Sequence, residues 1–200
     1  YIHVVPEKEM VVVLTGGAGE GSTSGEIMRS FIIPAAKSDG ALPANPEGVK
    51  RLEARIREVA QAAVQERKPV APLPPTAARV SGQWYVAEPN MFGLVGCSLT
   101  FAAEEEALLS VGLCPPAVEE DVKVAWAVGL DNVYRMNPGR FGLPVAAKGW
   151  WESENVFVVD LDEVANINHW RMSVTFEGDV VRAVMWEASG LPLQVIEGRA

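Results

Sequence analysis

Residues 170–187 read WRMSVTFEGDVVRAVMWE and carry the clearest structural signal in the chain. Two runs of alternating character flank Gly178-Asp179, and glycine supplies the positive φ that the first central position of a type II′ turn needs. The pattern predicts a β-hairpin closed at this turn. The apolar pairs expected across it are Phe176 with Val181, Val174 with Ala183, and Met172 with Met185.

The two faces of this hairpin differ in chemistry. One face is wholly apolar, whereas the other pairs Thr175 with Arg182 and Arg171 with Trp186, where a guanidinium can lie over an indole. A slip of one residue would expose the apolar face to water, so the register is strongly specified. The hairpin therefore needs further strands to complete a core.

Residues 78–200 supply further runs suited to strands. These runs are 82–87, 96–102, 107–113, 122–129, 133–136, 145–151, 155–161 and a last run near 193–197. Eight to ten short antiparallel strands joined by turns predict a closed or nearly closed all-β barrel. A barrel of about eight strands is either filled by side chains or holds one small ligand.

All six tryptophans lie in this half of the chain. They are Trp84, Trp126, Trp150, Trp151, Trp170 and Trp186. These residues are candidates for binding a ligand or for an interface, since several of them pointing inward would line an apolar pocket. We favour the alternative that they fill the core, where they need no ligand. Trp150 and Trp151 are adjacent and face opposite sides of a strand, so at least one should lie outside or at an interface.

The first part of the chain mixes strands and helices. Two apolar runs, residues 2–5 and 10–15, predict a hairpin whose second strand is buried on both faces. Thr23 and Glu26 form a capping box that opens a short helix, which Pro34 limits.

A second helix begins at Asn45, its expected cap, with Pro46 at the first helical position. Its apolar residues recur every three or four positions, so it should pack by one face. A proline-rich stretch then predicts a linker. The fold class expected is α+β overall: a hairpin plus two helices in residues 1–67, a linker in 68–77, and an antiparallel barrel in 78–200.

The glycine-rich loop between these elements, residues 16–25, fails as a nucleotide site. Ser22 stands where a phosphate-binding loop requires lysine and where a dinucleotide fingerprint requires its third glycine. As a nucleophile elbow it would have Thr23 at the centre, without the expected Asp-then-His order downstream.

Composition excludes several classes of protein. The net charge is −9, and residues 1–77 carry equal numbers of acidic and basic side chains, so the excess lies in the second half. An acidic surface disfavours the binding of nucleic acid. The sequence contains no run of 18 apolar residues, so no membrane span is predicted. Cys97 and Cys114 are expected to be buried free thiols. His3 and His169 are the only histidines, and neither a metal nor another cofactor is expected.

A family resemblance rests on residues 1–16, YIHVVPEKEMVVVLTG, and on the run Ile32-Ile33-Pro34-Ala35-Ala36. These stretches resemble the carboxyl end of serine hydrolases of the class C β-lactamase and penicillin-binding-protein superfamily. In that family the last strands of the sheet and a C-terminal helix close an α/β catalytic domain. Some members add a lipocalin-like barrel, and Gly149-Trp150-Trp151 with residues 176–180 is similar to that appendage.

The catalytic residues of this family are absent from the chain. No lysine has a serine three positions earlier, and the tyrosines are followed two positions later by His3, Ala87 and Met136. Ser153-Glu154-Asn155 copies one spacing of the family but is expected to form a turn. The resemblance thus implies an inactive C-terminal portion of a hydrolase whose catalytic elements precede Tyr1.

Three functions remain open from the sequence. The leading hypothesis is an accessory barrel that covers a catalytic domain of the same parent chain or mediates assembly. The alternative is a barrel that binds a small apolar ligand. A third is a homo-oligomer formed through residues 2–15, whose strand edges would otherwise be unpaired. The parent's substrate and the localisation cannot be read, because any targeting segment would lie upstream.

Overall fold

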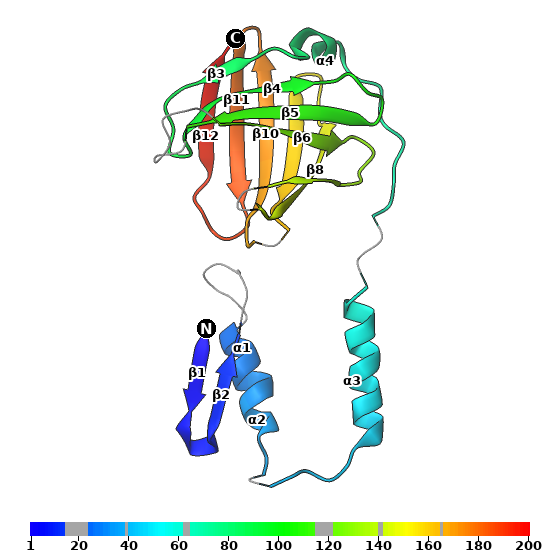
Figure 1. The fold of residues 1–200 in the computed structure, drawn as a ribbon, viewed down its shortest axis with the longest axis vertical. Coiled ribbons are helices and arrows are strands. Elements are labelled where there is room, and N and C mark those ends of the chain that lie inside the picture. Colours follow the sequence, from blue (N-terminus) through cyan, green and yellow to red (C-terminus); the bar gives the residue numbers. More distant parts are fainter. Residues whose placement is uncertain (15–23, 39, 62–64, 115–121, 140–141, 165) are drawn as a thin grey trace. The chain divides into compact units, whose positions relative to one another are not determined.

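The computed structural model describes the chain except for residues 15–23, 39, 62–64, 115–121, 140–141 and 165. The contacts divide the chain into two compact units, one built from residues before 66 and the other containing residues 66–200 (Figure 1). The glycine-rich loop and Thr23 of the expected capping box lie outside the described residues. Among the helices that are described, none has both the length and the apolar character needed to cross a lipid bilayer.

The first unit contains a hairpin and a series of helices. Strands β1 (Ile2–Val5) and β2 (Met10–Val13) pair antiparallel through the 3-10 turn η1 (Pro6–Lys8). The helical segments that follow are α1 (Ser24–Ile27), the π-helical η2 (Met28–Ile32), α2 (Ile33–Ala35) and α3 (Pro46–Val59). The hairpin and both expected helical regions are therefore present.

The burial expected in this unit is wrong at two places. Val11 and Val13 of β2 are exposed, because no described element of this unit packs on the hairpin face that they share with Ile2 and Val4. The cap of α3 is confirmed, since Asn45 Oδ1 accepts a hydrogen bond from the Gly48 amide at 2.9 Å.

The apolar stripe of α3 does not pack as expected. Its side chains remain exposed to solvent: Val49, Leu52, Ile56 and Val59. Its amphipathic pattern therefore describes a face that no described element of this unit covers.

The second unit is a closed β-barrel. Its strands are β3 (Tyr85–Ala87), β4 (Leu94–Thr100), β5 (Glu106–Leu113), β6 (Val122–Gly129), β7 (Arg135–Pro138), β8 (Pro144–Trp151), β9 (Val156–Asp162), β10 (His169–Glu177), β11 (Val180–Glu187) and β12 (Gln194–Arg199). They follow the order β6-β5-β4-β3-β12-β11-β10-β9-β8-β7, and an extra pairing of β6 with β8 closes nine of them into a barrel. The expected barrel and all ten of its strand-like runs are confirmed.

The central hairpin of β10 and β11 has the register expected from its alternation. Phe176 faces Val181 and Met172 faces Met185, with Gly178 at a positive φ of 60° in the turn. The cation–π contact differs, because the Arg171 guanidinium lies 5.8 Å from the ring centroid of Trp150, on β8, rather than over Trp186. Since β9 lies between β8 and β10, the long arginine side chain crosses one strand to reach that indole.

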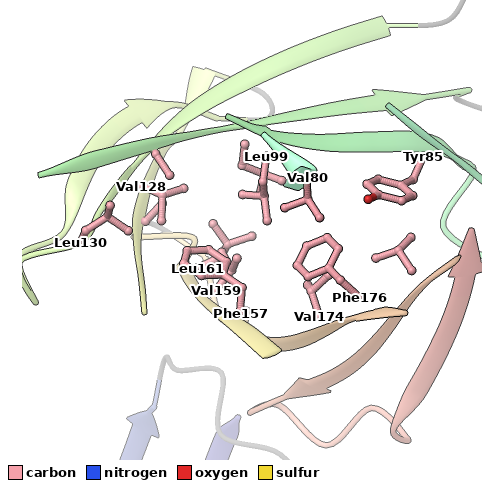
Figure 2. Close-up of a cluster of buried hydrophobic side chains, with 14 of the residues drawn as sticks. Val80, Tyr85, Leu99, Val128, Leu130, Phe157, Val159, Leu161, Val174 and Phe176 are labelled. Atoms are coloured by element: carbon pink, nitrogen blue, oxygen red, sulfur yellow. The ribbon is translucent and has the colours of Figure 1, made fainter. Parts of the chain in front are cut away.

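The interior of the barrel is packed most densely with aromatic side chains at one end. Phe157 is fully buried (Figure 2). Its ring centroid lies 5.2 Å from that of Phe101 and 5.3 Å from that of Trp151. Gly149 is required beside them, because a Cβ there would come within 2.7 Å of the Phe157 ring. This cluster forms the core on which the other strands pack.

Helix α4 (Pro75–Val80) lies at the same end of the barrel. The sequence predicted no helix here, because residues 68–77 were expected to form a linker. The Thr76 hydroxyl of α4 donates to Asn155 Oδ1 in the β8–β9 turn at 2.9 Å, and Ser81 Oγ accepts from the Phe101 amide at 2.9 Å. Val80 thereby enters the core, where it is 2% exposed. The barrel is therefore plugged at this end.

Substitution of Phe157 by alanine should destabilise the barrel by about 3 to 5 kcal/mol, since it removes a fully buried ring and leaves a cavity. Urea unfolding followed by circular dichroism measures the change. Val86→Ala, at an exposed position of β3, is the matched control and should stay within about 0.5 kcal/mol of wild type. An equal loss in both variants would contradict the packing described.

Candidate functional site: the interior of the barrel

A cavity of about 440 Å³ occupies the barrel interior away from the aromatic cluster. Its wall is built from inward-facing side chains of β3, β4, β5, β6, β9, β10, β11 and β12. Because side chains alternate along each strand, every second residue of these strands faces the cavity. Among the apolar side chains that line it are Leu99, Leu109, Met172, Ala183, Met185 and Ile196.

One rim of the cavity is formed by the β3–β4 loop. Asn90 orders this loop, since its Oδ1 accepts from the amides of Phe92 and Leu94, each at 3.1 Å. Phe92 packs edge to face against Trp170 of β10, with ring centroids 5.6 Å apart. The Trp170 indole then donates to Glu163 Oε1 at 3.3 Å, which places a carboxylate on the cavity lining.

The cavity lining carries few polar groups. Tyr85 of β3 is 4% exposed, and among the described residues its hydroxyl has no hydrogen-bond partner. Its ring lies inside the barrel wall, 5.9 Å from that of Phe176 (Figure 2). Burial raises the pKa of the Tyr85 hydroxyl, so the group keeps its proton. The charge of Arg79 lowers this pKa to a smaller extent, and the charge of Asp179 raises it.

Cys97 pairs directly with Tyr85 across β3 and β4 and also lines the cavity. Burial raises the pKa of its thiol to about 11, so the nucleophilic thiolate is scarce at neutral pH. Both cysteines are free, as expected, but the expected burial differs. Cys97 is half-buried, and Cys114 is exposed because it lies beyond the end of β5.

The six tryptophans take different positions. Trp126 and Trp170 line the cavity, whereas Trp151 belongs to the aromatic cluster at the plugged end. Trp150 and Trp186 are exposed on the outer surface, so the adjacent pair at 150 and 151 does face opposite sides. Trp84 is partly buried, and the Lys123 ammonium lies 5.1 Å from its ring centroid.

Sequence reasoning did not single out Tyr85 or Glu163, which carry the polar chemistry of the cavity. The alternation of the run at 82–87 and the position of Glu163 directly after the strand at 155–161 were the available signals. Neither signal shows which way a side chain faces until the register of neighbouring strands is known.

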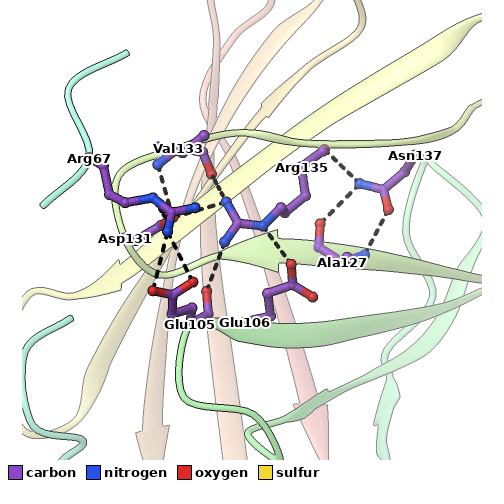
Figure 3. A network of polar contacts seen from close by, with 8 residues as sticks. All are labelled: Arg67, Glu105, Glu106, Ala127, Asp131, Val133, Arg135 and Asn137. Atoms are coloured by element: carbon purple, nitrogen blue, oxygen red, sulfur yellow. Dashed lines mark hydrogen bonds and ion pairs between the residues drawn. The ribbon is translucent and has the colours of Figure 1, made fainter. Parts of the chain in front are cut away.

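A first polar cluster lies where the turn after β6 meets the segment before α4. Asp131 is 1% exposed and accepts from Arg135 at 2.9 Å, while Arg67 Nε lies 3.1 Å from its other oxygen (Figure 3). Arg135 also contacts Glu106 at 2.6 Å. Burial opposes ionisation of Asp131, but the hydrogen bonds from Arg135 and the Val133 amide outweigh it and hold the pKa below its usual range. The cluster ties the chain entering the barrel to the barrel wall.

A second polar cluster surrounds Asp160 on the outer face of β9. The Tyr134 hydroxyl donates to Asp160 at 2.7 Å and Arg171 donates at 3.0 Å, while His169 Nε2 contacts the same carboxylate. Burial disfavours the charge of Asp160, which is 1% exposed, but these hydrogen bonds lower its pKa overall. Every oxygen of this carboxylate is occupied, so the cluster joins β9 to β10 and to the turn that precedes β7.

Neither cluster contains the paired serine and lysine of the hydrolase family, since that spacing is absent from the sequence. Ser153-Glu154-Asn155 lies in the β8–β9 turn, as expected. Within the described residues no three His, Cys, Asp or Glu side chains are grouped to hold a metal ion. The cavity is thus the one feature with the geometry of a binding site among those described above.

A scan against protein-family models and a search of curated proteins both return no match for this chain. The functional assignment therefore rests on the geometry of the barrel and on the residues that line it.

The Asp160 cluster should make stability depend on pH. Because the folded pKa of Asp160 lies below its unfolded value of about 3.9, its contribution is complete above that pH and is lost as the pH falls through the folded pKa. Asp160→Asn should cost about 2 kcal/mol or more at pH 7, and the difference from wild type should stay constant down to about pH 5 and shrink at lower pH. Urea unfolding at each pH measures it; a constant difference would contradict the ionised cluster.

Proposed function

We propose that the barrel of residues 66–200 binds one small apolar molecule in its interior. The cavity of about 440 Å³ carries this proposal. Ligand pockets in proteins commonly measure about 300 to 1,000 Å³ and are lined by apolar and aromatic side chains with a few polar groups. In this respect the barrel would act as a lipocalin-like binding module.

The composition of the lining favours an exchangeable occupant over permanent core filling. Met91, Met172 and Met185 contribute flexible thioether side chains that adapt to ligands of different shape. Ala87 and Ala183 keep the wall thin where larger residues would fill the space. Interiors of folded proteins have few voids larger than a water molecule, so an apolar cavity of this size favours a binding role.

Filling the cavity from within tests this proposal. Ala183→Phe adds a ring to the lining of β11 and should lower the affinity for N-phenyl-1-naphthylamine, a neutral fluorescent probe, at least tenfold. Wild type should bind the probe saturably at one equivalent. Ala125→Phe, on an exposed position of β6, is the matched control and should bind as wild type does. Failure of wild type to bind, or equal binding by all three proteins, would refute the proposal.

A second candidate function follows from the exposed apolar surface of the first unit. Ile2, Val4, Val11 and Val13 share one exposed face of the β1–β2 hairpin. We propose that this face packs against the remainder of a β-lactamase-like catalytic domain and that the barrel is its accessory module. In this proposal the chain itself has no hydrolytic activity.

The reading frame upstream of the Tyr1 codon tests this second proposal. It should encode a serine three residues before a lysine and a lysine or histidine followed by x-Gly. Purified chain should not hydrolyse nitrocefin. A reading frame without these elements, or a stable dimer by light scattering that Val11→Lys converts to monomer, would instead favour self-association through residues 2–15.

A further inference from the structure

Tyr85 brings a phenolic hydroxyl to the cavity lining, and the described residues supply no hydrogen-bond partner for it. The residue as a whole is 4% exposed. The other buried polar side chains described above show the opposite: Asp131 and Asp160 are each held by several donors. A hydroxyl in the lining of an apolar cavity is the kind of polar group that fixes the orientation of a ligand.

The charge of the lining limits what can enter. The lining residues include no lysine, arginine or histidine, and Glu163 brings a carboxylate to the lining beside the Trp170 indole. The Glu197 side chain is exposed instead and lies 3.8 Å from Arg182. Glu163 is held in place by the Trp170 indole and by Asn166, which donates to its other oxygen at 3.0 Å. An anionic ligand would meet a fixed negative charge, and no cation of the lining would compensate for it. The apolar surroundings increase the free-energy cost of this repulsion.

We propose that the barrel selects a neutral, mainly hydrocarbon molecule that carries one hydrogen-bond acceptor, such as a ketone or ester, and that Tyr85 donates to this acceptor. This inference rests on the proposed binding function and names its ligand class. Burial keeps Tyr85 protonated, so its hydroxyl is available as a donor. A ligand that displaces water from this hydroxyl must replace the lost hydrogen bond or bind at a penalty.

The position of Tyr85 sets the orientation of the ligand. The ring packs 5.9 Å from Phe176, whose own ring lies 5.9 Å from Trp151 in the aromatic cluster of the plugged end. Glu163 lies instead beside Trp170 and its partner Phe92, on the rim formed by the β3–β4 loop. The hydrogen-bond acceptor of the ligand therefore lies deep in the cavity beside Tyr85, and its hydrocarbon part fills the space toward the rim.

Two probes of equal shape test the hydrogen bond. 2-Acetylnaphthalene carries a carbonyl where 2-ethylnaphthalene carries a methylene group, and titration calorimetry measures both affinities. Tyr85→Phe should weaken the ketone by about 2- to 12-fold and leave the hydrocarbon unchanged, the range expected for one neutral hydrogen bond. Its melting temperature without ligand should equal or exceed that of wild type, because the substitution removes an unpaired hydroxyl.

Tyr134→Phe is the matched control. The Tyr134 hydroxyl donates to Asp160 on the outer face, so this variant should melt at a lower temperature and keep the wild-type ratio of the two affinities. A third probe, 2-naphthoate, should bind more weakly than the ketone, and Glu163→Gln should raise its affinity without changing that of the ketone.

The outcomes separate this inference from the proposed function. If neither naphthalene binds wild type, both the binding function and the inference fail. If both bind and Tyr85→Phe weakens them equally or not at all, the binding function stands and the assigned ligand class is wrong. A marked loss of thermal stability in Tyr85→Phe would likewise assign the hydroxyl to the fold.

Discussion

Closure of the sheet between β6 and β8 is the constraint on which the rest of the barrel depends. The two strands meet through the parallel pair of Gly129 and Lys148. Only glycine fits at the first position, because a Cβ there would lie 1.9 Å from the carbonyl oxygen of Val133 in the turn that follows. Asp131 and Arg135 hold that turn, so the seam of the barrel is kept by one buried ion pair and one small residue.

A sheet closed in this way encloses a fixed volume that side chains fill unevenly. At the end covered by α4, the rings of Phe101, Trp151 and Phe157 lie within 5.4 Å of one another and leave no room for a ligand. Away from that cluster the wall carries alanine, methionine and aliphatic residues, and a cavity remains. One end of the same interior therefore stabilises the fold while the other keeps the shape of a binding site.

The buried polar groups also fall into two kinds, those that hold the structure together and one that faces the interior. Asp160 on the outer face and Glu187, which accepts from Ser189 and Asn168, have their oxygens filled by neighbouring strands and loops. Such groups stabilise the strand ends and connections, since a buried charge without partners would be costly. Tyr85 faces the interior and lacks a described partner, which sets it apart from the polar groups that hold the structure.

Local pattern was enough to determine the strands and their pairing where the turn was short. Alternation and Gly178 specified the register of β10 and β11 from Met172 opposite Met185 to Phe176 opposite Val181, because a two-residue turn leaves one alignment that buries the apolar face. Asn45 as a helix cap followed from contacts within four residues. The tertiary structure alone decided which side chains share the interior: Tyr85 of β3 and Trp170 of β10 are far apart in the sequence and line the same cavity. The same holds for the exposed faces of β2 and α3, since burial depends on what packs against a face and not on its pattern.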